Sequence, residues 1–392
     1  MIGLRRKLFC ALVVTAGLLF GSGCATDVKD IEKLSYATAI GVDYRDGKYH
    51  GYLQFIDFQS FGKTSEGQKQ PTKTWVGEGV GSTFEQTLFD LYQTAQERIY
   101  WGHMTAIMIS ESAFKQGFGG IYDSFVRYHE FRLTPYVYGT RESIREIFST
   151  VGFFGQSPLS TILHEPKGTY SQTSFIKEVQ LHRLIGQINE PGFTSCIPVL
   201  AINKKQWTEK NKTEPKLMID GAIFLKNEAF RSYIPLKELF GLRWIQRGTV
   251  RAGIPVPNNS EPSVQIVVDN PKTKLKLVNA GDRPQYNIEM KATGYVVNRT
   301  KNNLLGLQQL TRKTTEVIEQ EIRKSFKVGL EKETDIFNLE HNLYRYHYRQ
   351  WKAISPAEVR LLNENAIRNV QIDLNIVHSS SEKNTTIQSR KH

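Results

Sequence analysis

The hydrophobic and polar positions along this chain switch repeatedly between the period of a strand and the period of a helix. Residues 31–58 alternate as two strands would, with the turn-forming sequence Arg-Asp-Gly at 45–47 between them. A polar stretch at 62–73 predicts a loop, and residues 74–76 resume a short strand. Thr83 then precedes apolar residues that recur every three or four positions, which predicts a capped helix through Phe84, Leu88, Leu91, Ala95 and Ile99.

The next part of the chain alternates predicted strands with predicted helices. Strands are expected at 104–109, 136–138 and 196–202, and helices at 114–128, 141–148 and 173–188. This order predicts a mixed sheet covered by helices. The polar stretch that follows, residues 203–216, contains five lysines and predicts a linker.

Beyond this stretch the pattern is mostly that of strands until a long amphipathic helix begins. Strands are expected at 217–225, 244–252, 263–268, 275–278 and 286–297. Residues 304–330 then follow the helical period, and a second helix is expected at 336–351. Apolar and polar side chains alternate strictly at 370–376, which predicts a half-buried strand.

These elements predict an α+β protein of three domains, built from mixed sheets flanked by helices. The chain has 392 residues, of which 40% are hydrophobic, and this is enough apolar material for two or three packed domains. The expected divisions are a signal peptide at 1–23, an N-terminal α+β domain at 24–202, a linker at 203–216, a sheet-rich middle domain at 217–285, a C-terminal α+β domain with the long helix at 286–378, and a disordered tail at 379–392.

The first 23 residues have the composition of an export signal. Three basic residues at 5–7 precede an apolar run at 8–20, which is too short to span a bilayer comfortably. The run ends in Gly-Ser-Gly-Cys at 21–24, which resembles a bacterial lipobox except that Gly21 stands where leucine is usual. We therefore expect a diacylglyceryl group on Cys24, since two acyl chains give stable anchoring. The alternative is an ordinary secretory signal in which Cys24 is incidental.

The net charge of +12 is unevenly distributed along the chain. Residues 24–200 contain 16 Lys and Arg against 19 Asp and Glu, whereas residues 201–392 contain 32 against 20. The basic second half is consistent with two interpretations, a solvated surface or a contact with anionic lipid headgroups or an acidic partner. An exported chain is not expected to bind nucleic acid.

The sequence TWVGEGVGST at 74–83 raises the possibility of a dinucleotide-binding loop, because glycines at alternate positions precede a helix. The third glycine of that fingerprint would fall at Ser82, and Glu78 would place a negative charge where a phosphate binds. The preceding strand is also short and polar, whereas the first strand of a dinucleotide-binding fold is a continuous apolar run. We therefore interpret the glycines as a tight turn leading into the helix.

No other pattern indicates catalysis, a cofactor or a metal site. No pair of histidines has the helical spacing of metal ligands, and no serine lies in a Gly-x-Ser-x-Gly elbow. Cys196 lies in an apolar strand and is expected to be an inert core residue. The sequence thus favours a protein that is not an enzyme.

Several segments, taken in order, resemble the Ger(x)C family, the lipoprotein C subunits of nutrient germinant receptors in endospore-forming bacteria. The segments that carry the resemblance are AIGVD at 39–43, TFEQTL at 83–88, ERIYWGH at 97–103, DGAIF at 220–224 and DIF at 335–337. The chain departs from the family pattern in three places. Family members commonly have glycine at the position of Asn338, tryptophan at that of Ala25, and a second tryptophan after Trp351.

The resemblance implies a three-domain α+β ectodomain without catalytic residues, anchored on the outer face of the spore inner membrane. It also implies a role in nutrient-triggered germination through contacts with A-type and B-type integral membrane subunits, to which the nutrient site is usually attributed. On this interpretation Gly102, His103 and Arg127 form a partner-facing turn, and the alternative is a purely structural role for each. A second hypothesis, a solute-binding lipoprotein of a transporter, requires two similar α/β lobes, and the pattern does not show that symmetry.

Overall fold

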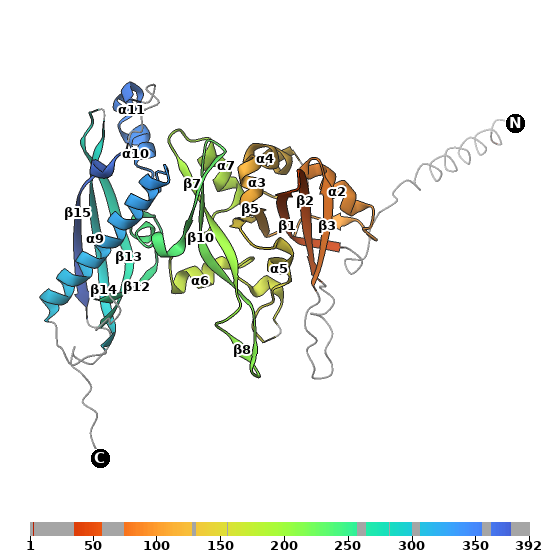
Figure 1. Ribbon diagram of the computed structural model, residues 1–392, viewed down its shortest axis with the longest axis horizontal. Helices are drawn as coiled ribbons and strands as arrows, with labels where there is room; N and C mark the ends of the chain where they lie inside the picture. Colours follow the sequence, from red (N-terminus) through yellow and green to blue (C-terminus); the bar gives the residue numbers. More distant parts are fainter. Residues whose placement is uncertain are drawn as a thin grey trace, which may run out of the picture.

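The computed structural model describes residues 3, 35–56, 74–127, 131–154, 156–256, 264–281, 283–299, 306–354 and 362–377. Cys24, the loop predicted at 62–73, the predicted tail and, apart from residue 3, the predicted signal peptide lie outside the described residues. Two sheets dominate the rest of the chain, and helices flank both of them (Figure 1). The predicted α+β class is therefore confirmed.

The larger sheet has nine strands and is parallel in its centre and antiparallel at both edges. The strands run in the order β11-β10-β7-β6-β5-β1-β2-β3, and β4 pairs with β1 beside this path. Their bounds are β1 (Ser35–Arg45), β2 (Lys48–Ile56), β3 (Thr74–Gly81), β4 (Ile99–Tyr100), β5 (Ala106–Ser110), β6 (Tyr136–Thr140), β7 (Thr194–Asn203), β10 (Lys216–Lys226) and β11 (Ala229–Pro235).

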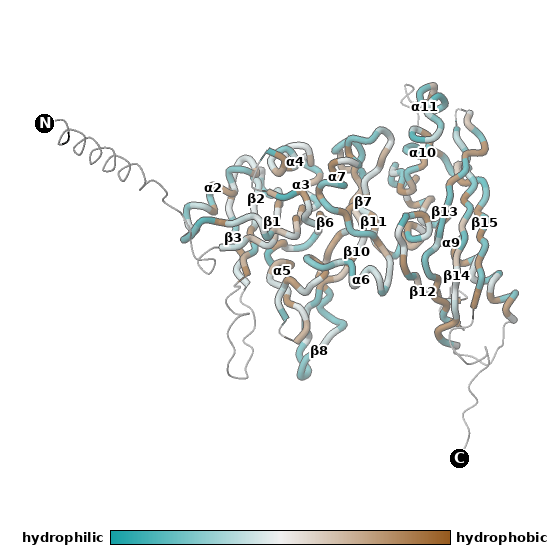
Figure 2. The backbone as a smooth tube through the Cα atoms, turned by 180° about the vertical axis from the view of Figure 1, so that it is seen from behind, coloured by the Kyte–Doolittle hydropathy of each residue, from teal (hydrophilic) through white to brown (hydrophobic). Residues whose placement is uncertain are grey.

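Helices cover both faces of this sheet, as the alternation of predicted strands and helices indicated. One face packs against α2 (Phe84–Tyr92), α3 (Glu111–Gln116), α4 (Phe118–Arg127) and α7 (Leu181–Ile188), and the other packs against α5 (Ile144–Ser149). The short helices η3 (Pro158–Ser160) and α6 (Pro166–Gln172) follow α5 in the chain. Hydrophobic residues are concentrated on the packed strands, as the brown segments of Figure 2 show.

The smaller sheet has four strands in the order β12-β13-β14-β15, and the long helix α9 crosses one of its faces (Figure 1). Its last pair, β14 and β15, is parallel. The bounds are β12 (Arg251–Val256), β13 (Val264–Asn279), β14 (Gln285–Arg299), β15 (Ile367–Val377) and α9 (Leu307–Glu331). The shorter elements near this sheet are η4 (Leu236–Glu238), α8 (Leu242–Ile245), α10 (Leu339–Tyr346), α11 (Tyr348–Ile354) and η6 (Glu364–Ala366).

The segment at 203–216 does not separate the two sheets. It leaves the larger sheet as a small hairpin of β8 (Thr208–Glu209) and β9 (Lys212–Thr213), after which the chain returns so that β10 pairs antiparallel with β7. Residues 217–285, expected as a middle domain, are divided accordingly, because β10 and β11 belong to the larger sheet and β12 and β13 to the smaller one. The lysines at 203–216 thus mark an exposed hairpin rather than a break between folding units.

The glycine-rich segment TWVGEGVG is a strand, so the predicted turn is wrong. It forms β3, in which Gly79 pairs with Gly51 of β2. A Cβ atom added to Gly79 would lie 2.1 Å from the backbone oxygen of Thr87, and one added to Gly51 would lie 2.0 Å from Thr87 Oγ1. The glycines therefore allow α2 to lie directly on the backbones of two strands.

The helix after this strand begins as predicted and ends earlier than predicted. Thr83 Oγ1 accepts a hydrogen bond from the backbone N–H of Gln86 at 3.4 Å, and Gln86 Oε1 accepts one from the N–H of Ser82 at 2.8 Å. α2 ends at Tyr92, and Ile99, which the helical period included, lies in β4. Ile99 matches the helical period only by coincidence. It is apolar because it is buried in β4, which pairs with β1.

Candidate functional site

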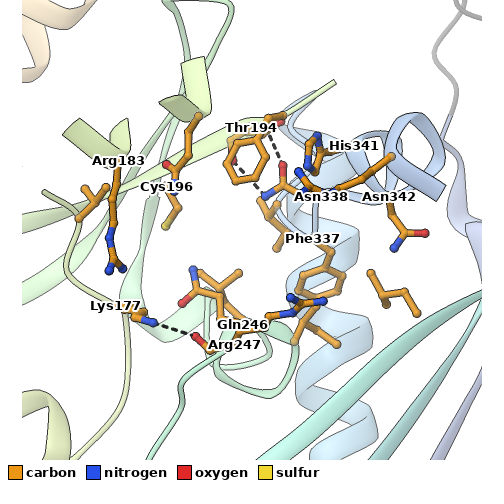
Figure 3. Close-up of a pocket in the computed structure, with 18 of the residues that line it drawn as sticks. Lys177, Arg183, Thr194, Cys196, Gln246, Arg247, Phe337, Asn338, His341 and Asn342 are labelled. Carbon is orange, nitrogen blue, oxygen red and sulfur yellow. Dashed lines mark hydrogen bonds between the residues drawn. The ribbon is translucent and has the colours of Figure 1, made fainter. Parts of the chain in front are cut away.

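The two sheets meet at a junction where the start of β7 contacts the start of α10. The backbone N–H of Thr194 donates to Asn338 Oδ1 at 2.6 Å, and Asn338 Nδ2 donates to the carbonyl oxygen of Thr194 at 3.1 Å. Figure 3 shows this reciprocal pair at the edge of a pocket. One side chain thereby satisfies both backbone groups of a residue on the other sheet.

Asn338 has a left-handed backbone conformation, with a φ angle of 56°. Glycine adopts this conformation most easily, and asparagine is among the few other residues that tolerate it. The left-handed backbone therefore explains why family members commonly have glycine at this position and why this chain can have asparagine there. Only asparagine can also form the hydrogen bonds to Thr194.

Further polar contacts surround this pair. Lys226 Nζ of β10 lies 2.5 Å from Glu340 Oε2, and the side chains of both residues are largely buried. The carbonyl oxygen of Pro191 lies 3.2 Å from His341 Nδ1, and the His341 ring meets the Phe193 ring edge-on at 4.8 Å. The junction is therefore held by several specific contacts and not by a flexible linker.

A buried carboxyl group lies next to these contacts. Asp335 Oδ2 accepts a hydrogen bond from the N–H of Glu340 at 2.8 Å, whereas its buried Oδ1 has no partner among the described residues. Burial raises the pKa of Asp335 to about 6, and the nearby Glu340 adds to the increase. The carboxyl group is therefore poised to gain or lose a proton in mildly acidic conditions.

A pocket of about 580 Å³ opens between the two sheets at this junction. Lys177, Arg183 and Cys196 line one side of it, and residues of α10 such as His341 and Asn342 line the other (Figure 3). This volume lies in the range of small-molecule sites in proteins. Its lining contains four basic residues, Lys177, Arg183, Arg247 and Arg345, and one acidic residue, Glu178.

The pocket contains a thiol, but its environment does not favour nucleophilic chemistry. Cys196 is a free cysteine. Burial raises its pKa to about 12, so the thiol stays protonated near neutral pH. A protonated thiol is a poor nucleophile and a poor metal ligand, but Cys196 is only partly buried and lines the pocket instead of lying within the core. The described part of the chain also contains no group of three or more His, Cys, Asp or Glu residues that could hold a metal ion.

The predicted partner-facing residues lie at two places on the larger sheet. The exposed ring of His103 packs edge-on against Tyr36 with centroids 4.9 Å apart, and a Cβ atom added to Gly102 would lie 2.7 Å from Tyr100 Cε1. Arg127, at the end of α4, is exposed, and its Nε donates to Asp123 Oδ2 at 2.6 Å. A side chain at position 102 would thus displace the exposed Tyr100 ring, and His103 and Arg127 are accessible from outside.

The predicted lipidation site, Cys24, lies outside the described residues. Within the residues that are described, none of the helices has the length and apolar composition needed to cross a membrane.

Sequence reasoning missed a polar network centred on Glu78. This carboxylate accepts hydrogen bonds from His50 Nδ1 at 3.0 Å, from Tyr52 OH at 3.1 Å and from Arg145 Nη2 at 2.6 Å, and it also contacts Arg45. Hydrogen bonds from Arg145, His50 and Tyr52 outweigh the effect of burial and lower the pKa of Glu78. Glu78 therefore ties β3 to α5.

The junction was also missed, because Asn338 and Thr194 are 144 positions apart in sequence. The one available signal was the departure from glycine at position 338.

Comparison with known proteins gives a consistent result along the chain. Residues 27–202 match the family model described as "Spore germination protein N-terminal domain", and residues 219–380 match the model described as "Spore germination B3/GerAC like, C-terminal". The interval between the two matches overlaps the predicted linker, although the larger sheet runs across it.

Two curated relatives and one solved structure are similar over much of the chain. Spore germination protein B3 of Bacillus subtilis (strain 168) is 21% identical over 350 residues, covering 86% of this chain and 89% of that protein. The putative spore germination protein YfkR of the same organism is 26% identical over 222 residues, or 56% of each chain. The solved structure described as "Crystal Structure of the GerBC protein" covers 90% of this chain and 100% of that one, with 15% identity and a TM-score of 0.48.

Proposed function

Since the chain belongs to the Ger(x)C family, we propose that it is a lipid-anchored, non-catalytic subunit of a spore nutrient germinant receptor. The observation that carries the proposal is that both germination-domain models match in order over most of the chain. The thiol of Cys196 is protonated, and the carboxylate of Glu78 is occupied by several hydrogen bonds. Neither group is activated as a nucleophile or a base, which supports a role without catalysis.

In this proposal the subunit lies on the outer face of the spore inner membrane, held by a diacylglyceryl group on Cys24. It acts by contacting the A-type and B-type integral membrane subunits of the receptor. The lipobox-like sequence before Cys24 supports the anchor, and the exposure of His103, in the turn after β4, and of Arg127, at the end of α4, supports contacts at these two places.

Affinity capture from detergent-solubilised spore membranes tests the assembly. We expect the tagged chain to recover two polytopic membrane subunits. Recovery of a permease and its ATPase instead would support the solute-binding alternative, which the junction pocket of about 580 Å³ favours. The unequal sizes of the two sheets argue against the two similar lobes of a solute-binding protein.

Fractionation of cells that lack the partner subunits tests the anchor separately. There, Cys24→Ala should release the chain from the membrane fraction and abolish labelling by a fatty-acid analogue. If the variant stays labelled and fully membrane-bound, Cys24 is not the lipidation site.

The contact through Arg127 can be tested against a matched arginine. Arg312 also forms an exposed ion pair within a helix, with Glu316 four residues away. The side chains of Arg312 and Glu316 are 73% and 55% exposed, and those of Arg127 and Asp123 are 78% and 53% exposed. Arg127→Ala should reduce the capture of partner subunits without changing the urea midpoint, and Arg312→Ala should change neither. Equal capture by the two variants would contradict a contact at Arg127.

A further inference from the structure

An exposed aromatic cluster lies between the segment that follows α5 and the hairpin that leaves the larger sheet, away from the junction. Phe154 is 96% exposed, and Phe153 and Trp207 are 38% and 46% exposed. The Phe153 ring lies between the other two, with its centroid 5.9 Å from that of Phe154 and 4.8 Å from that of Trp207. Three large aromatic rings thus gather where they gain little from burial within the chain.

Phe154 is also held in an unfavourable backbone conformation. Its φ angle is 56°, a left-handed value that bulky residues rarely adopt. An almost fully exposed ring at such a position contributes little to the stability of the fold. Exposed apolar groups of this kind commonly mark a surface that meets another phase or another molecule.

The hairpin beside this cluster is basic. Residues 203–216 contain five lysines and two glutamates, and Trp207 is part of the same segment. At the tip, Lys210 and Asn211 have φ angles of 46° and 65°, as in the tight turns that close two-residue hairpins. The hairpin projects from the body below α5, and its tip is hydrophilic (Figures 1 and 2).

Two of the five lysines pair with acidic groups, Lys204 with Glu146 and Lys216 with Glu214, and the other three retain their positive charge for an external partner. Glu146 Oε2 pairs with Lys204 Nζ at 3.0 Å, and Glu142 Oε2 accepts a hydrogen bond from the N–H of Ile202 at 3.0 Å. Among the described residues, Lys205, Lys210 and Lys212 form no ion pair. Their charges therefore lie next to exposed aromatic rings, which is the composition of a membrane-interface segment.

We propose that Phe153, Phe154, Trp207 and the lysines of residues 203–216, here called the aromatic–lysine patch, dock on an anionic lipid bilayer. The rings enter the boundary between headgroups and acyl chains, and the lysines lie against anionic headgroups. A bilayer fits better than a protein partner because lysine is depleted at protein interfaces and enriched in segments that bind acidic lipid. The patch adds a second attachment to the one proposed at Cys24, and it narrows the lipid contact from the whole basic second half to one hairpin and the two phenylalanines beside it.

Vesicle binding by the processed chain, residues 24–392 with Cys24→Ala, tests the patch without any attached lipid. We expect the chain to co-sediment with vesicles that contain equal parts of phosphatidylglycerol and phosphatidylcholine, and not with phosphatidylcholine alone. Adding salt should weaken the binding. The double variant Phe154→Ala/Trp207→Ala should bind at least about tenfold more weakly, because two rings no longer enter the interface.

Matched variants separate the patch from general hydrophobicity and charge. Phe89 is 64% exposed on α2, so Phe89→Ala should bind vesicles as the parent chain does. Lys205→Gln and Lys212→Gln should each weaken binding by about fivefold. Lys274→Gln, on the exposed face of β13, should have no effect.

Depth-dependent quenching locates the contact directly. Brominated lipids should quench Trp207 fluorescence, and Trp207→Phe should remove that quenching while binding persists.

The proposal is overturned if the parent chain does not bind anionic vesicles, or if the double variant binds as tightly as the parent. Capture of the membrane subunits that depends on Phe154, without vesicle binding, would identify the patch as a protein contact instead. Each of these results leaves lipidation of Cys24 intact, because that is measured by labelling in cells.

Discussion

The helices α2 and α9 each cover one face of a sheet, but they are held in place by different contacts. α2 lies on glycines, and Thr87 of this helix would collide with a Cβ atom at Gly51 or Gly79. α9 instead buries a charged group against the short helix α8, since Arg243 Nη2 lies 3.0 Å from both carboxylate oxygens of Glu321 and Trp244 Nε1 donates to Glu321 Oε2 at 2.7 Å.

The difference shows two ways of holding a helix in place, by close contact with strand backbones or by a buried ion pair with a neighbouring helix. Contact between backbones leaves no room for an added atom, so the α2 contact is sensitive to larger residues. A buried ion pair is sensitive to the loss of either member, because the other charge is then left without compensation. The contact at Gly79 and the Arg243–Glu321 pair should therefore fail under opposite kinds of substitution.

The largest effect is expected when the buried ion pair is broken. The side chains of Arg243 and Glu321 are only 4% and 8% exposed. Glu321→Gln leaves the arginine charge buried and should lower the free energy of unfolding by about 3–5 kcal/mol, measured by urea denaturation. Arg243→Met/Glu321→Leu should recover most of the loss.

An exposed ion pair on the same helix provides the control. Glu319 pairs with Arg323 at 2.7 Å, and both side chains are about 40% exposed. Glu319→Gln should cost less than about 1 kcal/mol. Similar losses for Glu319→Gln and Glu321→Gln would contradict the special role of the buried pair.

Acidification should affect the two regions in opposite directions. Near the larger sheet, burial lowers the pKa of His164 to about 3, so its stability contribution is present above the ordinary value of 6.5 and is lost as the pH falls from there toward 3. Near the smaller sheet, the pKa of Asp335 is raised to about 6, so its contribution is present below the ordinary value of 3.8 and is lost as the pH rises through 6.

Urea midpoints recorded between neutral pH and about pH 4 check these signs. His164→Gln should reduce the loss of stability that accompanies acidification. Asp335→Asn should remove the gain of stability that protonation of Asp335 provides as the pH falls through 6. Both substitutions can also change stability by the same amount at every pH, so the quantity to compare is the slope of the urea midpoint against pH. An unchanged slope in both variants would show that other groups control the pH response.

A smaller effect is expected at the glycine contact. Gly79→Ala should lower the free energy of unfolding by about 1–3 kcal/mol, because the obstacle is the backbone oxygen of Thr87 and not a movable side chain. Gly186 lies in α7, and a Cβ atom added there would meet no other atom within 4 Å, so Gly186→Ala should instead stabilise by up to about 1 kcal/mol. Stabilisation by both substitutions would mean that α2 does not lie directly on the strands.

The smallest effect is expected at the junction between the sheets. Asn338→Gly removes two hydrogen bonds to Thr194 but relieves the left-handed backbone, so the net cost should be about 1 kcal/mol. The informative measurement is hydrogen exchange of the Thr194 amide, which should become faster. Asn227 has a φ angle of 50° and its side chain forms no hydrogen bond among the described residues, so Asn227→Gly should leave that amide unchanged.

Patterns within single elements predicted much of the fold. The hairpin of β1 and β2 turns at Asp46 and Gly47, whose φ angles are 52° and 76°. The cap at Thr83, the long helix α9 and the alternating strand β15 also lie where their patterns indicate. These features depend on periods and caps that span only a few residues, so a single sequence contains the necessary information.

The errors share one physical cause, which is that a local pattern does not identify the surface against which it packs. Glycines at alternate positions are compatible both with a turn and with a strand beneath a helix. Here they form a strand, because the backbone of α2 packs directly on them. A polar, lysine-rich segment is compatible both with a linker and with a projecting hairpin. Here it forms a hairpin, because the strands on either side of it, β7 and β10, pair with each other.

The sequence by itself determined most of the elements, the α+β class and the family, because periodicity, caps and short motifs are local properties. Only the tertiary structure decided which strands share a sheet, how Asn338 joins the two sheets, and where exposed aromatic rings meet lysines. Those features bring together residues that are far apart in the chain, and their stability comes from contacts that exist only after the chain has folded.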